Sequence, residues 1–429
     1  MTDGPAQPRP RVGRLLDRSP SLLRDNRDFR RYWTGQTISL FGDQITELAV
    51  PLAGVLVLDA SPAQMGYLTA AGLAPNLLFA LHAGAWVDRR GRRRQAMIAA
   101  DLARAALLAT VPLFYAFGAL SLIELYVVVF LAGTCTTVFH VSSSSLFIGL
   151  VPREQYLQGT SLLYGSRAFS FVGGPGASGV LVQLLSAPVA LLADACSFLV
   201  SALFLGRISP VEPPTDEGET GHVVAGARYI RQSATVRSCL AATATINFFG
   251  YGFLALFVLY ATRYLHVRAA VLGAVLGAGA VGGLIGAALT SRLGRRIGVG
   301  PAFLLGCVLF PAPILLVPLA GGPHLLVLAM LFAAEFGSGL GVMILDISIG
   351  AIFAALIPPQ LRSRVSGAYL VVNNGVRPLG SLFGGAVGAT AGVRPALWVA
   401  GLGGILGFLW LLPSPIPRLK ELPEEPEAV

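Results

Sequence analysis

Gly84-Ala-Trp-Val-Asp-Arg-Arg-Gly-Arg-Arg-Arg94 is a short basic stretch between two long apolar runs. Its five arginines lie within six residues, Asp88 precedes them, and Gly91 lets the chain reverse direction at little steric cost. Arginine clusters are usually solvated or nucleic-acid-facing patches. Here the flanking apolar runs are long enough to cross a membrane, so the stretch is interpreted as a tight loop between two membrane helices.

A second copy of this stretch, Ala287-Ala-Leu-Thr-Ser-Arg-Leu-Gly-Arg-Arg296, follows after close to half the chain length. Each copy comes after the second hydrophobic segment of its half. The chain is therefore predicted to consist of two related halves. The aligned residues are Arg89 with Arg292, Gly91 with Gly294, Arg92 with Arg295 and Arg93 with Arg296.

The composition is that of a membrane protein. Of the 429 residues, 54% are hydrophobic and only 12% are charged, and the mean hydropathy is +0.70. Soluble domains have about 25% charged residues, so this chain has too few to cover a water-facing surface. Four cysteines lie singly in apolar runs, which favours packing over a disulfide or metal site; no metal or cofactor is expected.

Twelve hydrophobic segments have about the length that a helix needs to cross the hydrocarbon layer. The predicted fold is an all-α polytopic membrane protein with twelve transmembrane helices in two pseudo-symmetric six-helix bundles. The predicted spans are residues 33–57, 64–86, 95–116, 123–145, 160–183, 187–206, 239–260, 269–290, 300–320, 324–348, 366–388 and 394–412.

The bundles are predicted at residues 29–206 and 239–412, with three polar regions around them. Residues 1–28 are rich in proline and arginine, residues 413–429 in proline and glutamate, and both are expected to be disordered tails. Residues 207–238 contain an acidic, proline-containing linker. The apolar stripe from Val223 to Arg237 then predicts an amphipathic helix on the inner leaflet.

Arginine and lysine are distributed unevenly between the two sides of the predicted membrane. With the N-terminus inside, 25 of these cations fall on cytoplasmic segments and 3 on external loops. Because positive charge is retained inside, both termini are predicted to be cytoplasmic, in a multi-pass protein of the cell (inner or plasma) membrane. This bias explains the net charge of +9 without a nucleic-acid partner.

Gly-x-x-x-Asp-Arg-x-Gly-Arg-Arg between the second and third spans resembles the signature loop of the major facilitator superfamily. In the second copy, Ala287 replaces the glycine and Ser291 the acid. Further stretches resemble the branch of drug and siderophore exporters, which includes macrolide and enterobactin efflux proteins. These stretches are Phe41-Gly-Asp-Gln44, Leu361-Arg-Ser-Arg-Val365 and Pro378-Leu-Gly-Ser-Leu-Phe-Gly-Gly385.

Ionisable residues inside the spans are functional candidates, because a charge at mid-helix costs about 2.5–3.5 kcal/mol to insert. Asp43 lies near the middle of the first span, and Glu47 lies one turn further on the same face. Two nearby acids repel, which raises the proton affinity of one and suits a proton carrier. The alternative is that both bind an arginine or hydroxyls and only fix the packing.

Spans four and ten place further ionisable groups at matching depth. His140 lies twelve residues before Pro152, and Asp346 lies twelve residues before Pro358. A lone histidine is usually a packed core residue, but this match makes His140 equally a candidate for proton or substrate binding. Glu335, deeper in span ten, is a further proton-coupling candidate.

Arg167 and Arg377 also match, each seven residues before a glycine in spans five and eleven. They could pair with the acids or hold an anionic substrate. The resemblance implies that spans one, four, seven and ten line a central cavity, so Asn247 in span seven joins the substrate candidates.

Asp101 and Arg104 are spaced to satisfy each other. Asp194 is expected to be a structural acid. The resemblance implies that spans three and six, which carry these residues, are peripheral.

A conformational gate is expected at the two basic stretches. The resemblance implies that Asp88 lies near the inner end of span eleven, where Arg362 and Arg364 are the neighbouring cations. Gly174-Pro175 in span five partly resembles the Gly-Pro signature of exporting antiporters and predicts a kink. The other gate candidates are Gly84, Arg89, Gly91, Arg92, Arg93, Arg292, Gly294 and Arg295.

No enzyme site is predicted. The Gly-x-Gly-x-x-Gly run at residues 277–282 follows no strand, and no phosphate-binding loop is present. We predict a monomeric transporter that exports an amphipathic small molecule in exchange for protons by alternating access. The alternatives are an uptake or facilitated-diffusion permease of the same fold, and a membrane sensor or scaffold that transports nothing.

Overall fold

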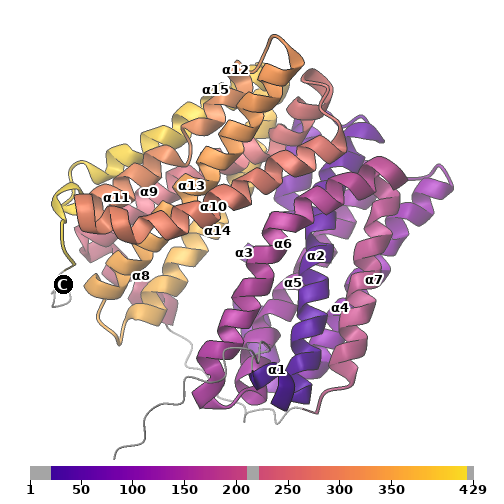
Figure 1. The fold of residues 1–429 in the computed structure, drawn as a ribbon, viewed down its shortest axis with the longest axis horizontal. Helices are drawn as coiled ribbons and strands as arrows, with labels where there is room; N and C mark the ends of the chain where they lie inside the picture. The colour runs from indigo at the N-terminus through magenta and orange to yellow at the C-terminus, as the bar shows by residue number, and fades with distance from the viewer. Residues whose placement is uncertain (1–20, 210–221, 423–429) are drawn as a thin grey trace, which may run out of the picture.

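The computed structural model describes residues 21–209 and 222–422, which form helices and helical turns without a strand among them (Figure 1). The first half contains α1 (Ser21–Asp25), α2 (Arg27–Leu56), α3 (Pro62–Arg90), α4 (Arg93–Ala116), α5 (Leu122–Leu150), α6 (Tyr156–Leu185) and α7 (Ala187–Gly206). The second contains α8 (His222–Gln232), α9 (Ala234–Leu259), α10 (Ala269–Ile297), α11 (Val299–Leu309), α12 (Leu316–Leu319), α13 (His324–Leu356), α14 (Arg362–Thr390) and α15 (Val393–Leu406).

Eleven of the twelve predicted spans each fall on one of these helices or on a helix with its adjoining turn, whereas the ninth, residues 300–320, covers α11, a short helical turn and α12. Within the described ranges, nine helical segments are long and apolar enough to cross a membrane. The helices α2, α3 and α14 are as long but less apolar, and they are the ones that carry Asp43, Asp88 and Arg377. The predicted all-α polytopic membrane fold is confirmed.

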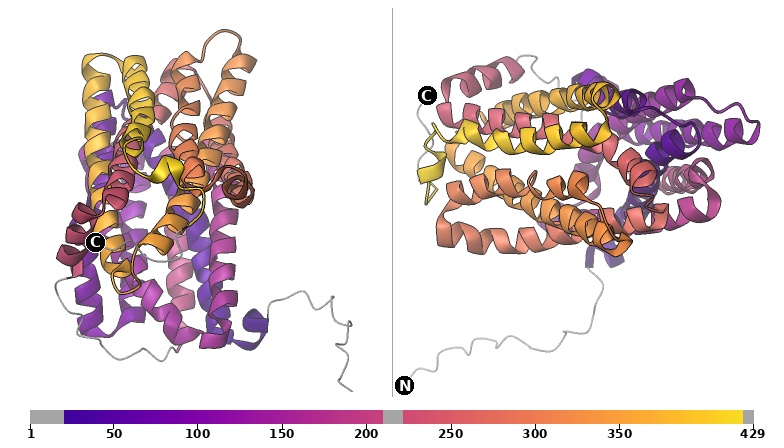
Figure 2. Two further views of the ribbon diagram at one scale, coloured as in Figure 1. Left: turned by 90° about the vertical axis from the view of Figure 1, so that its left-hand side faces the viewer. Right: turned by 90° about the horizontal axis from the view of Figure 1, so that it is seen from above.

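The helices α2–α7 and α9–α15 form two bundles that lie side by side and inclined to each other (Figures 1 and 2). Contacts between the bundles come from α3 with α14, α6 with α10, and α2 and α3 with α9. We call the end of the molecule at which α3 turns into α4 the basic end, because the arginine clusters lie there. We call the other end the sealed end.

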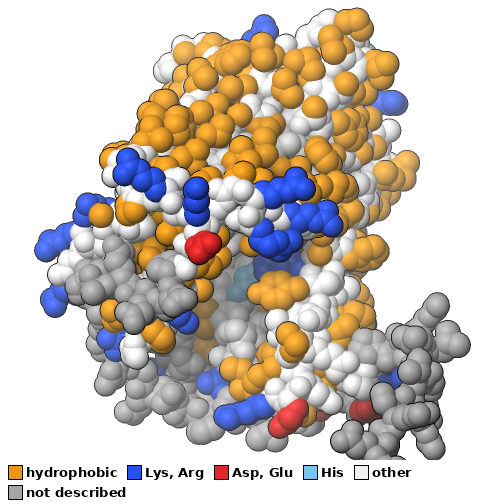
Figure 3. All heavy atoms as spheres, turned by 60° about the vertical axis from the view of Figure 1, so that its left-hand side comes forward, with side chains coloured by type: hydrophobic (Ala, Val, Ile, Leu, Met, Phe, Trp, Pro, Cys, Tyr) orange, Lys and Arg blue, Asp and Glu red, His pale blue; other side chains and the backbone are white. Residues whose placement is uncertain are grey.

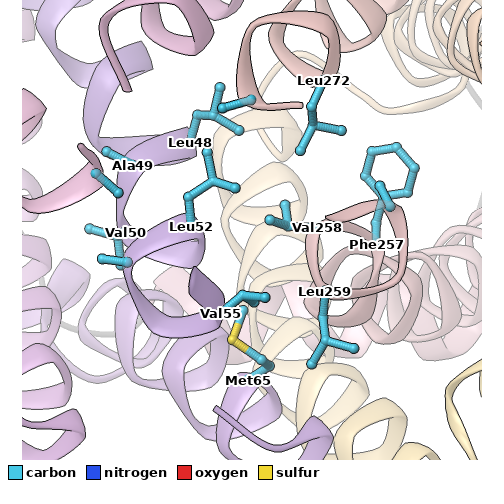
Figure 4. Close-up of a cluster of buried hydrophobic side chains, with 14 of the residues drawn as sticks. Leu48, Ala49, Val50, Leu52, Val55, Met65, Phe257, Val258, Leu259 and Leu272 are labelled. Carbon is cyan, nitrogen blue, oxygen red and sulfur yellow. The ribbon is translucent and has the colours of Figure 1, made fainter. Parts of the chain in front are cut away.

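A cluster of buried hydrophobic side chains joins the two halves at the sealed end. Leu48, Val55 and Met65 from α2 and α3 meet Val258 and Leu272 from α9 and α10 (Figure 4). An ion pair between Asp59 Oδ1 and an Arg263 guanidinium nitrogen at 2.5 Å spans the same boundary. Both halves therefore contribute to one apolar core at this end.

Glycines bring the helices of the two halves into backbone contact near the sealed end. A Cβ added to Gly179 of α6 would lie 2.4 Å from the carbonyl oxygen of Ala269 at the start of α10. A Cβ added to Gly66 of α3 would lie 2.8 Å from the carbonyl oxygen of Ser381 on α14. Small residues permit such close helix crossings inside a membrane.

The two basic stretches fold differently, and this corrects the expected repeat of the turn. Gly91 ends α3 with a left-handed φ of 60°. In the second copy α10 continues through Gly294 to Ile297, and the chain turns at Gly298, whose φ is 97°. Residues after Gly294 are compatible with a helix, and cations in a last turn are favoured by the helix dipole, so the turn moves to the next glycine.

The linker helix packs on protein, and its position on the inner leaflet stays a prediction. The structure describes α8 but not residues 210–221. Tyr229 and Ile230 are buried among residues of α13 and α14, and the Tyr229 hydroxyl donates to the carbonyl of Leu356 at 3.2 Å. A Cβ on Gly226 would lie 2.1 Å from the carbonyl oxygen of Arg364, so α8 is seated closely on α14.

The described parts of both tails are ordered, contrary to expectation. Leu22 of α1 is fully buried, and the Asn26 side chain caps α2 by accepting from the Phe29 amide at 2.8 Å. At the other terminus the amide of Gly300 donates to the carbonyl of Leu419 at 2.9 Å. The remaining tail residues, 1–20 and 423–429, lie outside the described ranges.

Candidate functional site

The midpoint of α2 presents two carboxylates to the space between the halves. The Asp43 side chain is 38% exposed, and Glu47, one turn further on, is exposed although it lies in the middle of a membrane-length helix. Gln44 donates to Glu47 Oε2 at 3.0 Å. Figure 3 shows a hollow between the two halves, with cationic side chains gathered beside it.

Arg104 on α4 connects Asp43 to the interior of the first bundle. Its guanidinium forms a close ion pair with Asp101, as the spacing of the two residues predicted. The same guanidinium lies 3.8 Å from Asp43 Oδ1 and donates a long hydrogen bond to Thr136 at 3.5 Å. This helix, which the resemblance places at the periphery, therefore brings a cation to the central acid.

Asp194 on α7 has the structural role expected of it. It accepts hydrogen bonds from Thr46 of α2 and from Ser197 of its own helix, the latter at 2.9 Å. Gly42 makes this contact possible, because an added Cβ would lie 2.2 Å from Asp194 Oδ1. The hydrogen bond from Thr46 thus fixes the rotation of α2 that turns Asp43 and Glu47 toward the hollow.

Arg167 and His140 complete the charged groups of the first half. Both side chains are exposed, on α6 and α5 respectively. Arg167 is close enough to Asp43 and to His140 for electrostatic interaction. His140 also interacts electrostatically with Arg104. The structure thus brings four of the predicted residues, Asp43, Glu47, His140 and Arg167, into one region.

The second half contributes a hydrogen-bonded network around Arg377. The Arg377 Nε donates to Asn247 Oδ1 at 3.1 Å, and the Asn247 amide donates to Asn373 Oδ1 at 3.0 Å. The guanidinium also lies over the ring of Tyr251, 5.1 Å from its centroid. Tyr251 on α9 is also close enough to Glu47 on α2 for electrostatic interaction, and these two helices are in contact.

The two acids of α13 are placed differently. Asp346 is exposed and interacts electrostatically with Arg377, so it belongs to the same region. Glu335 lies against α10, where a Cβ on Gly279 would be 3.3 Å from its carboxylate oxygen. Among the described residues, no ion pair to Glu335 is recorded. The structure therefore groups Asp346, but not Glu335, with the other candidates.

Among the gate candidates at the basic end, Arg362 is held within its own half. Arg362 donates to the carbonyls of Ile357 at 3.0 Å and Ala354 at 2.5 Å, which closes the end of α13. Arg89, Arg92, Arg292 and Arg295 are exposed, whereas Arg93 is buried. The side chain of Asp88 lies outside the described part of the chain, so its proposed partners stay a prediction.

Gly174 and Pro175 lie where α6 crosses α2 and α10. A Cβ on Gly174 would be 2.6 Å from Gln44 Cγ, and a Cβ on Gly273 would be 2.1 Å from the Pro175 carbonyl oxygen. Because Gln44 in turn binds Glu47, this crossing sets the position of the central acids. The carbonyl of Gly174 accepts from the Ser178 hydroxyl at 2.7 Å.

Sequence reasoning missed Tyr251 and Asn373 and underrated Arg104. Tyr251 and Asn373 carry no intramembrane charge and stand in no repeated motif. The position of Asn373, one turn before Arg377, could have suggested a shared helix face. The reach of Arg104 to Asp43 depends on how α4 is rotated against α2, which spacing along one helix cannot reveal.

The paired helical bundles agree with the comparisons to known proteins. A family model described as Major Facilitator Superfamily matches residues 32–375 and 240–429. The chain belongs to the major facilitator superfamily. It is therefore a membrane transporter of this superfamily's type, embedded in a lipid bilayer and acting on a small-molecule substrate.

Among curated proteins, the chain is similar to a superfamily member, the "Uncharacterized MFS-type transporter YkuC" of Bacillus subtilis (strain 168). The two are 24% identical over 367 residues, which are 80% of this chain and 81% of that one.

Two solved structures are similar in fold. One is a bacterial homologue of the iron transporter ferroportin in an inward-facing state, with a TM-score of 0.75, 17% identity, and coverage of 90% of this chain and 98% of that one. The other is the nucleoside transporter NupG, with a TM-score of 0.71, 12% identity, and the same coverage of 90% and 98%. The resemblance to drug and siderophore exporters stays a prediction.

Proposed function

We propose that this transporter exports an amphipathic small molecule in exchange for protons. The observation that carries the proposal is the environment of Asp43, whose side chain is 38% exposed and lies 3.8 Å from a buried arginine. A carboxylate in that position has a route for protons from water and an opposite charge that competes with them. An acid that can exchange a proton inside the membrane is the part that a proton-coupled transporter requires.

The basic end is proposed to face the cytoplasm, because positive charge is retained on that side. The buried cluster at the sealed end would then close the external side, and the hollow would open inward. Substrate would enter the hollow from the cytoplasm or the inner leaflet. Closure of the basic end and opening of the sealed end would then release it outside.

The polar network of the second half is proposed to hold the substrate. Arg377 and Asn247 present donors and acceptors beside the ring of Tyr251, so one site offers both hydrogen bonds and an aromatic face. Such a site suits an amphipathic molecule, whose polar and apolar parts need different partners. Glu47 lies across the gap from Tyr251 and would sense whether substrate is present.

The test is transport in proteoliposomes containing the purified protein and a panel of amphipathic fluorescent dyes. Proton-coupled export predicts dye movement that depends on an imposed pH gradient and runs opposite to the proton flow. Dye movement that follows its own gradient regardless of pH would indicate facilitated diffusion and contradict the proposal. No movement of any dye or of a nucleoside panel would favour a sensor or scaffold.

Uptake is the second candidate function. The neighbour named as a nucleoside transporter shares the fold, and its name gives no direction of transport. In the same proteoliposomes, uptake coupled to protons predicts that substrate and protons move in the same direction. The direction of proton flow relative to substrate therefore separates the two candidates.

A further inference from the structure

Arg104 is a buried cation with two carboxylate neighbours at different distances. Its side chain is 2% exposed and forms a close pair with Asp101, which is fully buried. Its contact with Asp43 is longer, at 3.8 Å, and Asp43 is the partner that reaches the hollow. Of the two acids, only Asp43 can readily exchange protons with water.

The guanidinium is held in place independently of Asp43. It lies 3.9 Å from the ring centroid of Phe198 on α7 and 4.6 Å from that of Phe139 on α5. Two aromatic faces and the Asp101 carboxylate thus fix a flat cation between three helices. Neutralising Asp43 would break only the longer of the two ion pairs of Arg104.

If Asp43 were the only carboxylate beside Arg104, its protonation would be costly. Protonation of Asp43 would then leave a buried arginine without a counter-charge, and an uncompensated buried charge is strongly destabilising. Asp101 removes this difficulty, because Arg104 keeps an anionic partner in both protonation states of Asp43. Asp101 therefore allows Asp43 to be protonated without leaving Arg104 uncompensated.

Other charged and titratable groups face Asp43 from the elements around it. Glu47 lies on its own helix, Arg167 on α6 and Asp194 on α7, while His140 on α5 interacts with Arg104 and Arg167. The side chains of Arg167 and His140 are exposed, whereas Arg104 is buried. Asp194 already accepts two hydrogen bonds. Arg104 is the only described cation within 4 Å of Asp43.

We propose that Arg104 and Asp101 form a positioning pair that sets the proton affinity of Asp43 and keeps the buried arginine compensated while Asp43 changes charge. In the step itself, the Asp43 carboxylate takes a proton from water in the hollow and becomes a neutral acid. Arg104 stays paired with Asp101, and no other group changes its charge. The inference rests on the proposed function, because it assigns Asp43 as the coupling acid.

The test measures the protonation of Asp43 directly. Infrared difference spectra of the purified protein in nanodiscs are recorded across a pH series, and the carboxylic-acid band that Asp43→Asn removes is assigned to Asp43. The variants are Asp101→Asn, Arg104→Gln and the double variant. Asp59→Asn is the matched control, because it neutralises an acid at the sealed end.

Opposite shifts are expected for the two single variants. Asp101→Asn leaves Arg104 to Asp43 alone and should lower the midpoint by about one pH unit or more. Arg104→Gln removes the cation and leaves Asp101 nearby, so it should raise the midpoint. The double variant should fall between wild type and Arg104→Gln, and Asp59→Asn should match wild type.

Several results would overturn the inference. They are shifts of both single variants in one direction, an unmoved midpoint in Asp101→Asn, and the lack of any Asp43 titration in wild type. If Arg104→Gln does not fold, the titration midpoints of Asp101→Asn and of the double variant still test the inference. The spectra can be recorded whether or not the protein transports anything. If the midpoints follow the expected order but a pH gradient drives no transport, the proposed function is refuted and the role of the Arg104–Asp101 pair is not.

Discussion

At the scale of single residues, Asp43 and Glu47 share a helix face but not a role. Asp43 has a buried cation beside it, whereas Glu47 is exposed and held by Gln44. A proton that binds Asp43 changes the balance of charge around Arg104. A proton that binds Glu47 removes a negative charge near Tyr251. We therefore propose that Asp43 carries the coupled proton and that Glu47 responds to substrate.

Neutral variants should separate these roles. Asp43→Asn should abolish uphill transport driven by a pH gradient while retaining exchange of substrate across the membrane, because its site cannot alternate between charged and neutral forms. Glu47→Gln should weaken substrate binding and retain some driven transport. Both fluxes are measured in the same proteoliposomes. Full driven transport in Asp43→Asn would move the coupling site to another of the predicted acids.

Arg377 should contribute to substrate binding through its hydrogen bonds. Removing a charge-assisted hydrogen bond costs about 1.5–3 kcal/mol, so Arg377→Gln should weaken binding by roughly tenfold or more. Binding of the transported dye is measured by fluorescence with purified protein. Asn373→Ala is a useful companion, since Asn373 accepts a hydrogen bond from Asn247. Unchanged affinity in Arg377→Gln would exclude it from the substrate site.

The candidate site was predictable in part. Intramembrane charge identified Asp43, Glu47, His140, Arg167, Asp346 and Arg377, and the structure brings these together. The same criterion also selected Glu335, which lies at the contact of α13 with α10. Charge at membrane depth shows that a residue is unusual, but the rotation of its helix decides which neighbours it meets. That rotation depends on packing contacts such as Gly42 against Asp194.

At the scale of elements, the sealed end depends more on helix packing than on its ion pair. Asp59 is 93% exposed and Arg263 is 34% exposed. An exposed pair contributes about 0–1 kcal/mol, which is too little to hold two bundles together. Asp59→Asn should therefore change transport only slightly. Complete loss of transport in this variant, with normal insertion, would show that the ion pair is the main lock.

The crossing of α6 and α10 should be sensitive to one methyl group. Gly179→Ala places a carbon against the Ala269 carbonyl and should push the sealed end apart, whereas Gly176→Ala enters open space on the same helix. Spin labels at Ala119 and Gly321, introduced as cysteines, report the distance across this end. We expect a longer distance in Gly179→Ala only. Identical distances in both variants would contradict this account of the closure.

The order of helices was predictable, but their ends were less so. Apolar runs marked each span, since a helix must remain apolar for the thickness of a membrane. The polar first turns of α2 and α9 extend beyond those runs. The turn after α10 moved to Gly298 because a glycine inside a helical segment does not by itself end it. The apolar stripe of α8 was recognised, but sequence could not show that α14 covers it.

At the scale of the whole molecule, alternating access requires the basic end to close when the sealed end opens. In the present state Arg362 is bound to the carbonyls at the end of α13, and Gly84 has open space where a Cβ would be. We expect α3 and α14 to approach at this end in the other state, with Asp88 near Arg362 and Arg364. Asp88→Asn should lower transport without loss of insertion. Wild-type transport by a well-inserted Asp88→Asn variant would contradict this role.

The central claim is that substrate and protons move in opposite directions through one site that includes Asp43. The most direct measurement uses proteoliposomes with an entrapped pH dye and an imposed gradient of a transported substrate, but no initial pH gradient. Wild type should move protons against the direction of the substrate flow, and Asp43→Asn should move substrate without protons. Proton movement in the direction of the substrate, or equal proton movement in Asp43→Asn, would contradict the account.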